Sequence, residues 1–150
     1  MRYMILVKSI PAFEAQHEGH FAPDAQVFAE MAAYHEELAR AGVLLDGNGL
    51  KPTRRGWRVR YDGAHRTVID GPFTESKELI AGYTLIQVAS RAEAMEWARR
   101  FPNPVSAGQP AEIEVRELFE PEDFAAAWAR RVSQNNRVAV VDPRPTGLSY

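Results

Sequence analysis

Strand-like and helical segments alternate along this chain in an order that few folds accommodate. Residues 3–8 form a short apolar run before a proline, as in a buried strand. Apolar residues then recur at helical spacing over residues 24–42, which start at an N-capping aspartate and end on a glycine. A second helical segment, residues 90–101, starts at a capping box of Ser90 and Glu93. Each helix is therefore expected between strands, as in an α+β domain.

Further strand-like segments complete this order. They are residues 43–45, 57–61, 67–70, 82–88 and 112–118. Asp62-Gly63 is a favourable turn between the second and third of them, so we expect a β-hairpin there. The β-α-β-hairpin-β-α-β order predicts a ferredoxin-like βαββαβ fold with an inserted hairpin. Helices would cover one face of its sheet, so we expect the other face to pack against a second copy in a homodimer, forming a dimeric α+β barrel.

Local irregularities are expected at two places. Residues 11–23 mix proline, glycine and two histidines, which is typical of a loop. Residues 46–49, Asp-Gly-Asn-Gly, interrupt the second strand and predict a bulge or a close approach of the backbone. Between these segments, the first helix is expected to turn an apolar stripe toward the sheet, comprising Val27, Phe28, Met31, His35 and Leu38.

The length of 150 residues suits one domain. We expect that domain to span residues 1–131, with a short C-terminal helix around Phe124, Ala127 and Trp128. Residues 132–150 contain two prolines and a glycine without a helical period. That composition predicts a C-terminal tail, either an extended arm on a partner or a disordered end.

Composition excludes several classes of function. A net charge of -2 gives no field for direct nucleic-acid binding or for an anionic membrane. No apolar run approaches the ~20 residues that span a bilayer, and the N-terminus is typical of a first strand rather than a signal peptide. The absence of cysteine removes disulfides and thiolate metal sites and is compatible with a cytoplasmic protein. Residues 17–20, His-Glu-Gly-His, lack the helical zinc spacing, so we expect no metal and no bound organic cofactor.

Residues 70–78, Asp-Gly-Pro-Phe-Thr-Glu-Ser-Lys-Glu, form the segment whose residue types best suggest a site. Asp70 ends a strand, where a carboxylate can act as a general base or orient a ligand. It can equally form a turn by accepting backbone N–H groups two residues on. Gly71, Pro72 and Phe73 are interpreted as a structural turn, in which glycine allows a close approach, proline fixes φ and phenylalanine enters the core.

Charged residues follow within one turn of Phe73. A helical turn would place Glu75 and Glu78 on one face, which makes Glu75 a candidate catalytic carboxylate. Lys77 stands between them and is a candidate anion ligand, or a charge that lowers the pKa of a neighbour. The alternative is a solvated, self-neutralising loop, which we favour for Glu78.

Three residues outside this segment are further candidates. His35 lies on the apolar stripe of the first helix and can shuttle protons near pH 7, or it is a core histidine satisfied by one partner. Arg58 and Arg60 share one face of the hairpin, and Arg60 can bind a carboxylate or phosphate unless that face is simply solvated. Tyr83 can offer a hydroxyl to a ligand, or it packs in the core.

These residues together resemble a known family. The sequence DGPFTESKE over residues 70–78, followed by Leu-Ile-Ala-Gly-Tyr, is similar to the signature of the YCII-related proteins of the DGPF type. The resemblance covers about residues 1–120 and includes residues 3–6, 36–45, 49–50 and 93–98. It implies a dimeric α+β barrel with a pocket near the sheet, similar in fold to muconolactone isomerases and small antibiotic-biosynthesis monooxygenases. It also implies a catalytic role, and the association of members with extracytoplasmic-function sigma factors implies a regulatory setting.

The sequence departs from the family pattern at two positions. Asn48 stands where an acid is usual, and His35 stands where asparagine or another small polar residue is expected. The His–Asp pair ascribed to the YCII branch has no recognisable counterpart histidine here.

Three functional hypotheses follow. The first is a small-molecule enzyme that uses acid–base chemistry in a barrel pocket. The second is a non-catalytic ligand-binding or regulatory dimer linked to transcription control. The third is that residues 70–78 are only a demanding turn, in which case any pocket beside them should be dry and empty.

Overall fold

The computed structural model describes residues 1–15, 24–74, 77–106, 108–125, 127 and 129–131. Several sequence predictions fall outside these residues, namely those for His17, His20, Glu75, Trp128 and the tail 132–150. The chain divides into two compact units, Met1–Leu118 and Phe119–Tyr150, and each is described by itself.

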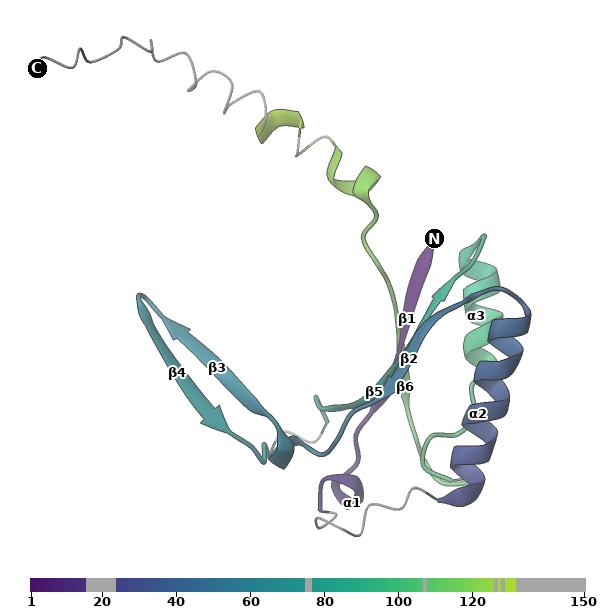
Figure 1. Ribbon diagram of the computed structural model, residues 1–150, viewed down its shortest axis with the longest axis horizontal. Helices are drawn as coiled ribbons and strands as arrows, with labels where there is room; N and C mark the ends of the chain where they lie inside the picture. The colour runs from purple at the N-terminus through teal and green to yellow at the C-terminus, as the bar shows by residue number, and fades with distance from the viewer. Residues whose placement is uncertain (16–23, 75–76, 107, 126, 128, 132–150) are drawn as a thin grey trace, which may run out of the picture. The chain divides into compact units, whose positions relative to one another are not determined.

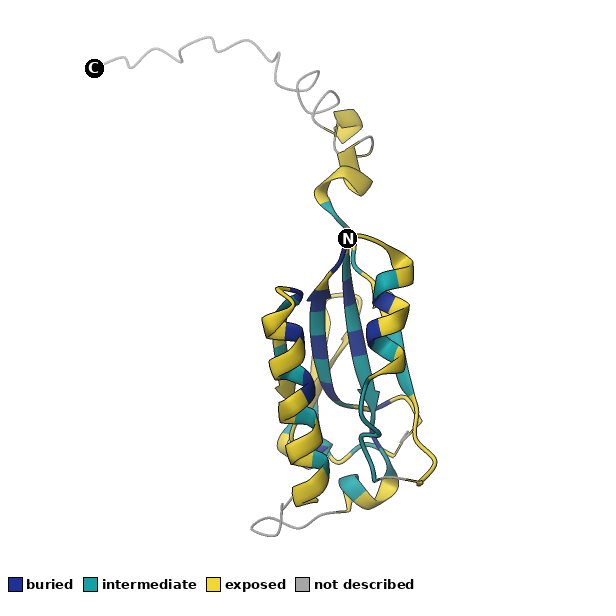
Figure 2. Cartoon of the chain, turned by 90° about the vertical axis from the view of Figure 1, so that its right-hand side faces the viewer, coloured by how far each residue is buried: buried dark blue, intermediate teal, exposed yellow. Residues whose placement is uncertain are grey.

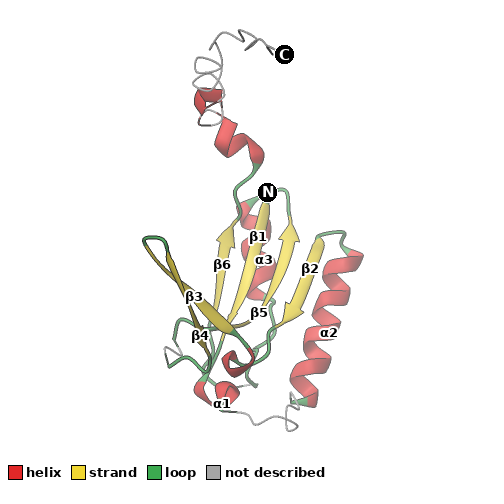
Figure 3. Ribbon diagram, turned by 60° about the vertical axis from the view of Figure 1, so that its left-hand side comes forward, coloured by secondary structure: helices red, strands yellow, loops and turns green. Residues whose placement is uncertain are grey.

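The first unit is an α+β domain, as predicted (Figure 1). Its elements are β1 (Arg2–Lys8), α1 (Pro11–Glu14), α2 (Ala25–Arg40), β2 (Leu44–Gly49), η1 (Thr53–Arg55), β3 (Trp57–Asp62), β4 (His65–Asp70), β5 (Ile80–Gln87), α3 (Arg91–Arg99) and β6 (Ile113–Glu117). Four strands form an antiparallel sheet in the order β2-β5-β1-β6, and β3 pairs with β4 in a separate ribbon. Both α2 and α3 cover the same face of the sheet, and within the described residues of this unit no long helix covers the opposite face (Figures 1 and 3).

The helices begin and end where the sequence predicts. The side chain of Asp24 accepts a hydrogen bond from the Gln26 N–H at 2.9 Å, which caps α2. The chain leaves that helix through Gly42, whose φ of 72° lies in the left-handed region. Ser90 caps α3 by accepting from the Glu93 N–H at 3.1 Å. These local contacts confirm the predicted boundaries because capping depends on neighbouring residues alone.

The core lies between the sheet and the two helices, where the buried residues form bands along the facing surfaces (Figure 2). Ile5, Leu38 and Ile86 have no exposed area. The Tyr34 hydroxyl donates to the Trp97 carbonyl oxygen at 2.7 Å and so joins α2 to α3. Burial raises the pKa of Tyr34 to about 12, so the phenol stays protonated and keeps this bond.

The apolar stripe predicted for α2 is wrong in part. Tyr34, which the prediction omitted, is buried with Leu38, whereas Phe28 leaves 65% of its area exposed. The reason is that glycines on β2 and β5, Gly47, Gly49 and Gly82, offer no side chains to the first half of that helix. The helix therefore packs tightly only toward its C-terminal half.

Two other local predictions need correction. The expected loop over residues 11–23 contains the short helix α1, which starts at Pro11 because proline suits the first turn of a helix. The strand expected to break at residue 46 continues to Gly49 as β2. Its register shifts between Leu44 and Asp46, so the predicted irregularity is present within a continuous strand.

The predicted hairpin is confirmed. Strands β3 and β4 pair in register around a turn in which Gly63 has a φ of 58°. The ribbon extends from the side of the sheet that carries no helix (Figures 1 and 3). Its apolar face is exposed: Trp57 leaves 66% and Tyr61 leaves 67% of its area open to solvent.

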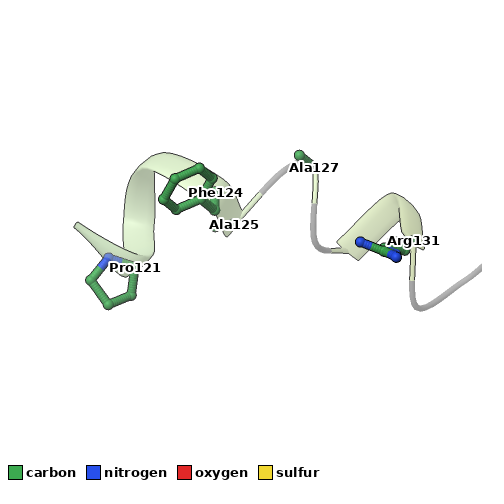
Figure 4. Close-up of a pocket in the computed structure, with 5 residues that line it drawn as sticks. All are labelled: Pro121, Phe124, Ala125, Ala127 and Arg131. Atoms are coloured by element: carbon green, nitrogen blue, oxygen red, sulfur yellow. The ribbon is translucent and has the colours of Figure 1, made fainter. Parts of the chain in front are cut away.

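The second unit contains the 3₁₀ turn η2 (Pro121–Phe124), where the Glu120 N–H donates to Asp123 Oδ2 at 2.7 Å. Figure 4 shows a pocket along this unit, lined by Pro121, Phe124, Ala125, Ala127 and Arg131. All five residues come from one short stretch of chain, and Arg131 is the sole titratable group among them. In the described part of the chain, no helix has the length and hydrophobicity needed to cross a bilayer.

Candidate functional site

The Asp-Gly-Pro-Phe segment is anchored to η1 through Thr53. The Gly71 N–H donates to the Gly56 carbonyl oxygen at 3.0 Å, and the Phe73 N–H donates to Thr53 Oγ1 at 3.0 Å. A Cβ on Gly71 would lie 1.8 Å from the Thr53 carbonyl oxygen, so no other residue fits this backbone approach. The expectation that Phe73 enters the core is wrong: its half-buried ring lies outside the core cluster and stacks against the Arg58 guanidinium, whose carbon lies 3.9 Å from the ring centroid.

Glu14 connects this anchor to the rest of the domain. Its Oε2 accepts from the Thr53 N–H at 3.0 Å and from Thr53 Oγ1 at 2.7 Å. Its Oε1 accepts from Ser9 Oγ at 3.0 Å, just beyond the end of β1. Sequence reasoning missed Glu14 and Thr53, because a contact across 39 positions leaves no periodic signal.

A cavity of about 650 Å³ lies elsewhere, between the first half of α2 and the sheet. From α2 it is lined by Val27, Phe28, Met31, Ala32 and His35. The strands contribute a floor that includes Val7, Gly47, Gly49, Gly82 and Thr84. Phe13, Phe101, Pro104 and Val105 close its sides. A volume of this size is typical of small-molecule sites.

His35 and Thr84 form a polar contact in the cavity wall. His35 Nε2 lies 2.8 Å from Thr84 Oγ1, and Thr84 is only 2% exposed. Burial lowers the pKa of His35 below its ordinary 6.5, so the imidazole is neutral at pH 7. Gly47 makes room for the ring, since a Cβ there would lie 3.1 Å from His35 Nε2. Within the described residues, His35 Nδ1 makes no hydrogen bond.

Tyr83 presents its hydroxyl to a different cluster. Because side chains alternate along β5, Tyr83 and Thr84 point to opposite faces of the sheet. The Tyr83 hydroxyl donates to Asp46 Oδ2 at 2.9 Å. The Asn48 amide donates to both of them, at 3.0 Å to the hydroxyl and 3.0 Å to Asp46 Oδ1. An acid at position 48 would lose these donors and face the Asp46 carboxylate, which explains physically why asparagine suits this chain.

The remaining candidates do not converge on the cavity. Asp70 ends β4 opposite Trp57 and is exposed, as are Arg60 on the ribbon and Lys77. None of these three belongs to the cavity lining, and Glu75 lies outside the described residues. Of the described candidates, His35 and Tyr83 belong to the cavity lining, and His35 is the one of the two that was predicted as an acid–base residue.

No group of three His, Asp or Glu side chains in the described ranges is arranged to hold a metal ion. The lining of the cavity is mainly apolar with few polar groups, a composition typical of sites that bind organic molecules.

These features define a small α+β domain with helices on one face of its sheet and a cavity beneath the first long helix. Comparison with known proteins places it further: the model of the YCII-related domain matches residues 1–120, and the chain belongs to that family. It is also 32% identical over 98 residues to the uncharacterized protein R00369 of Rhizobium meliloti (strain 1021). That alignment covers 65% of this chain and 79% of the relative.

Replacing Gly71 by alanine tests the anchor at Thr53. We expect Gly71→Ala to lower the free energy of unfolding by about 2 kcal/mol, because the clash is between two backbone segments and neither can rotate away. The matched control is Gly56→Ala, whose Cβ would lie 3.6 Å from the same carbonyl oxygen. It should change stability by less than about 0.5 kcal/mol in urea unfolding. Equal stability of the two variants would show that the close approach of the Gly71 backbone to the Thr53 carbonyl oxygen does not require glycine.

Because burial lowers the pKa of His35, the direction in which pH changes the stability of the fold can be predicted. The unfolded chain binds a proton at this residue more readily than the folded chain, so the contribution is full above pH 6.5 and is lost as pH falls through the depressed folded pKa. The wild type should therefore lose more stability between pH 7 and pH 5 than His35→Gln. NMR titration of the His35 ring should give a midpoint below 6.5, and a midpoint at or above it contradicts the burial argument.

Proposed function

We propose that this protein binds a small organic molecule in the cavity under α2 and uses His35 as an acid–base group on it. The observation that carries the proposal is a neutral imidazole, paired with a buried hydroxyl, in the wall of an otherwise largely apolar cavity. A general base works best when its pKa lies close to the working pH and its neutral form predominates. Burial of this ring supplies the second condition, because the lowered pKa of His35 keeps the imidazole neutral at pH 7.

Thr84 gives the imidazole a defined orientation. With the proton on Nε2, the ring donates to Thr84 Oγ1 and keeps the Nδ1 lone pair for a proton from a ligand. With the proton on Nδ1, Thr84 donates to Nε2 and the ring presents a donor instead. One hydrogen bond thus lets the neutral ring present either an acceptor or a hydrogen-bond donor to the ligand, and the acceptor form is the one that takes a proton as a general base. The roles of Asp70, Glu75, Lys77, Arg60 and Tyr83 stay predictions, and no step of this proposal requires them.

The arrangement of strands supports a finer description of the fold. Two helices on one face of a β2-β5-β1-β6 sheet correspond to the ferredoxin-like split βαβ pattern. The helix-free face carries Met4, Leu6 and Leu85, which are half-buried in the single chain. We propose that this face packs on the same face of a second copy, giving the dimeric α+β barrel.

The cavity proposal is tested by a thermal-shift screen of small organic compounds. Gly49→Leu should abolish the shifts, because a Cβ at Gly49 meets nothing within 4 Å and the longer side chain would fill the cavity. Compounds that bind are then assayed for turnover, which His35→Gln should reduce by at least about 100-fold while binding persists. Glu36→Gln is the matched control, since that neighbour is exposed and paired with Arg40.

The outcomes separate the hypotheses. Shifts that survive in Gly49→Leu would place binding elsewhere and overturn the proposal. Binding without turnover in the wild type would overturn the catalytic role and favour the non-catalytic ligand-binding dimer.

The dimer is tested by the mass in solution. Light scattering on the wild type should give twice the mass of one 16.8 kDa chain. Leu6→Glu should give single chains, because a carboxylate would be buried without a partner in the sheet-on-sheet interface. Glu36→Gln, on the outer surface of α2, should remain dimeric. A wild type that stays monomeric at micromolar concentration contradicts the proposal.

A further inference from the structure

We propose that the cavity under α2 selects a neutral, planar, mainly apolar molecule that carries one hydroxyl or carbonyl group, and that it rejects carboxylates and phosphates. This inference rests on the proposed function and adds the chemical class of the ligand. It is carried by three features of the lining, namely its charges, its polar pair and its glycine floor.

Charged groups among the described lining residues favour an anion little. Lys8 is the one lysine or arginine among them, and its charge is offset by Glu114, whose Oε1 lies 3.8 Å from its Nζ. Asp24, the one acid among them, repels an anion and is itself engaged in capping α2. A carboxylate that entered would lose its hydration without gaining a counter-ion, which is costly in an apolar site.

The pair of His35 and Thr84 matches a single uncharged group. Asn48 and Tyr83 also belong to the lining, but their polar groups bond to each other and to Asp46. His35 and Thr84 hold one hydrogen bond between them, and the imidazole keeps a second nitrogen. Between them they can donate to a carbonyl oxygen, or accept from a hydroxyl, according to which nitrogen carries the proton. A site of this kind favours a ligand with that one group over a hydrocarbon of equal shape, because the hydrocarbon leaves a polar atom unpaired.

The glycine floor matches a flat ligand. Packing inside the chain accounts for two of the three glycines: a Cβ at Gly47 would crowd the His35 ring at 3.1 Å, and one at Gly82 would lie 2.9 Å from the Asn48 carbonyl oxygen. A Cβ at Gly49 meets nothing within 4 Å, so no atom of the described residues explains the missing side chain. Gly49 pairs with Gly82 in the ladder, and together they leave a strip of bare backbone across two strands. A planar ring can lie on that strip beneath the aliphatic and aromatic side chains of α2.

The test compares three probes of similar shape at pH 7.5: 2-naphthol, naphthalene and 2-naphthoate. Their affinities are measured by fluorescence titration of the whole chain. We expect 2-naphthol to bind about tenfold more tightly than naphthalene, since one hydrogen bond is worth roughly a factor of ten. We expect 2-naphthoate to bind at least about tenfold more weakly than naphthalene.

Two variants assign the preference to the polar pair. Thr84→Val and His35→Leu should each reduce the affinity for 2-naphthol toward that for naphthalene, while naphthalene binding stays within about twofold. Glu36→Gln should change none of the three affinities, and circular dichroism checks that each variant is folded.

The results distinguish failure of this inference from failure of the proposed function. If 2-naphthoate binds best, or if naphthalene equals 2-naphthol, and Gly49→Leu removes the binding, the ligand class is wrong and the cavity remains a binding site. If none of the probes binds, or if binding is indifferent to Gly49→Leu, both the inference and the proposed binding function are contradicted.

Discussion

The register between β1 and its two neighbours determines what every other part of the domain can do. Ile5 stands opposite Thr84 on one side and Val115 on the other, so all three face the helices. A slip of β1 by one residue would turn its own side chains over and direct Leu6 instead of Ile5 toward the helices. The hydrophobic core and the helix-free face therefore both depend on this pairing.

Much of the fold could be predicted because its signals are local. The caps at Asp24 and Ser90 and the Asp62-Gly63 turn depend on residues within three positions of one another. The family signature over residues 70–78 was recognisable for the same reason, and the family match confirms it. The local prediction that was wrong in part is the apolar stripe of α2. Helical spacing identifies a face of the helix, but it does not reveal whether the facing strands carry side chains.

The candidate site was harder to predict because it is formed by glycines that lack side chains and by residues far apart in the sequence. His35 could be selected from the sequence as a polar residue on an apolar stripe, but Thr84 lies 49 positions away in a strand with no distinguishing pattern. The cavity arises where β2 and β5 present glycines to the helix, and glycines in a strand were interpretable only as an irregularity. Residues 70–78 were predicted as a site because of their charged side chains. The contacts that hold the Asp-Gly-Pro-Phe part in place are instead made by the backbone of Gly71 and by Thr53.

The β3–β4 ribbon is anchored at its base, so a small tilt at the base would displace its tip by a larger distance. Each strand has six residues, so at about 3.4 Å per residue the ribbon is roughly 20 Å long. A tilt of about 10° at Thr53 would sweep the turn at Gly63 through about 3 Å, estimated from that same rise per residue. The carboxylate of Glu14, which accepts two hydrogen bonds from Thr53, lies at the base about which such a tilt would occur. A small shift at this base would therefore be enlarged at the exposed tip of the ribbon.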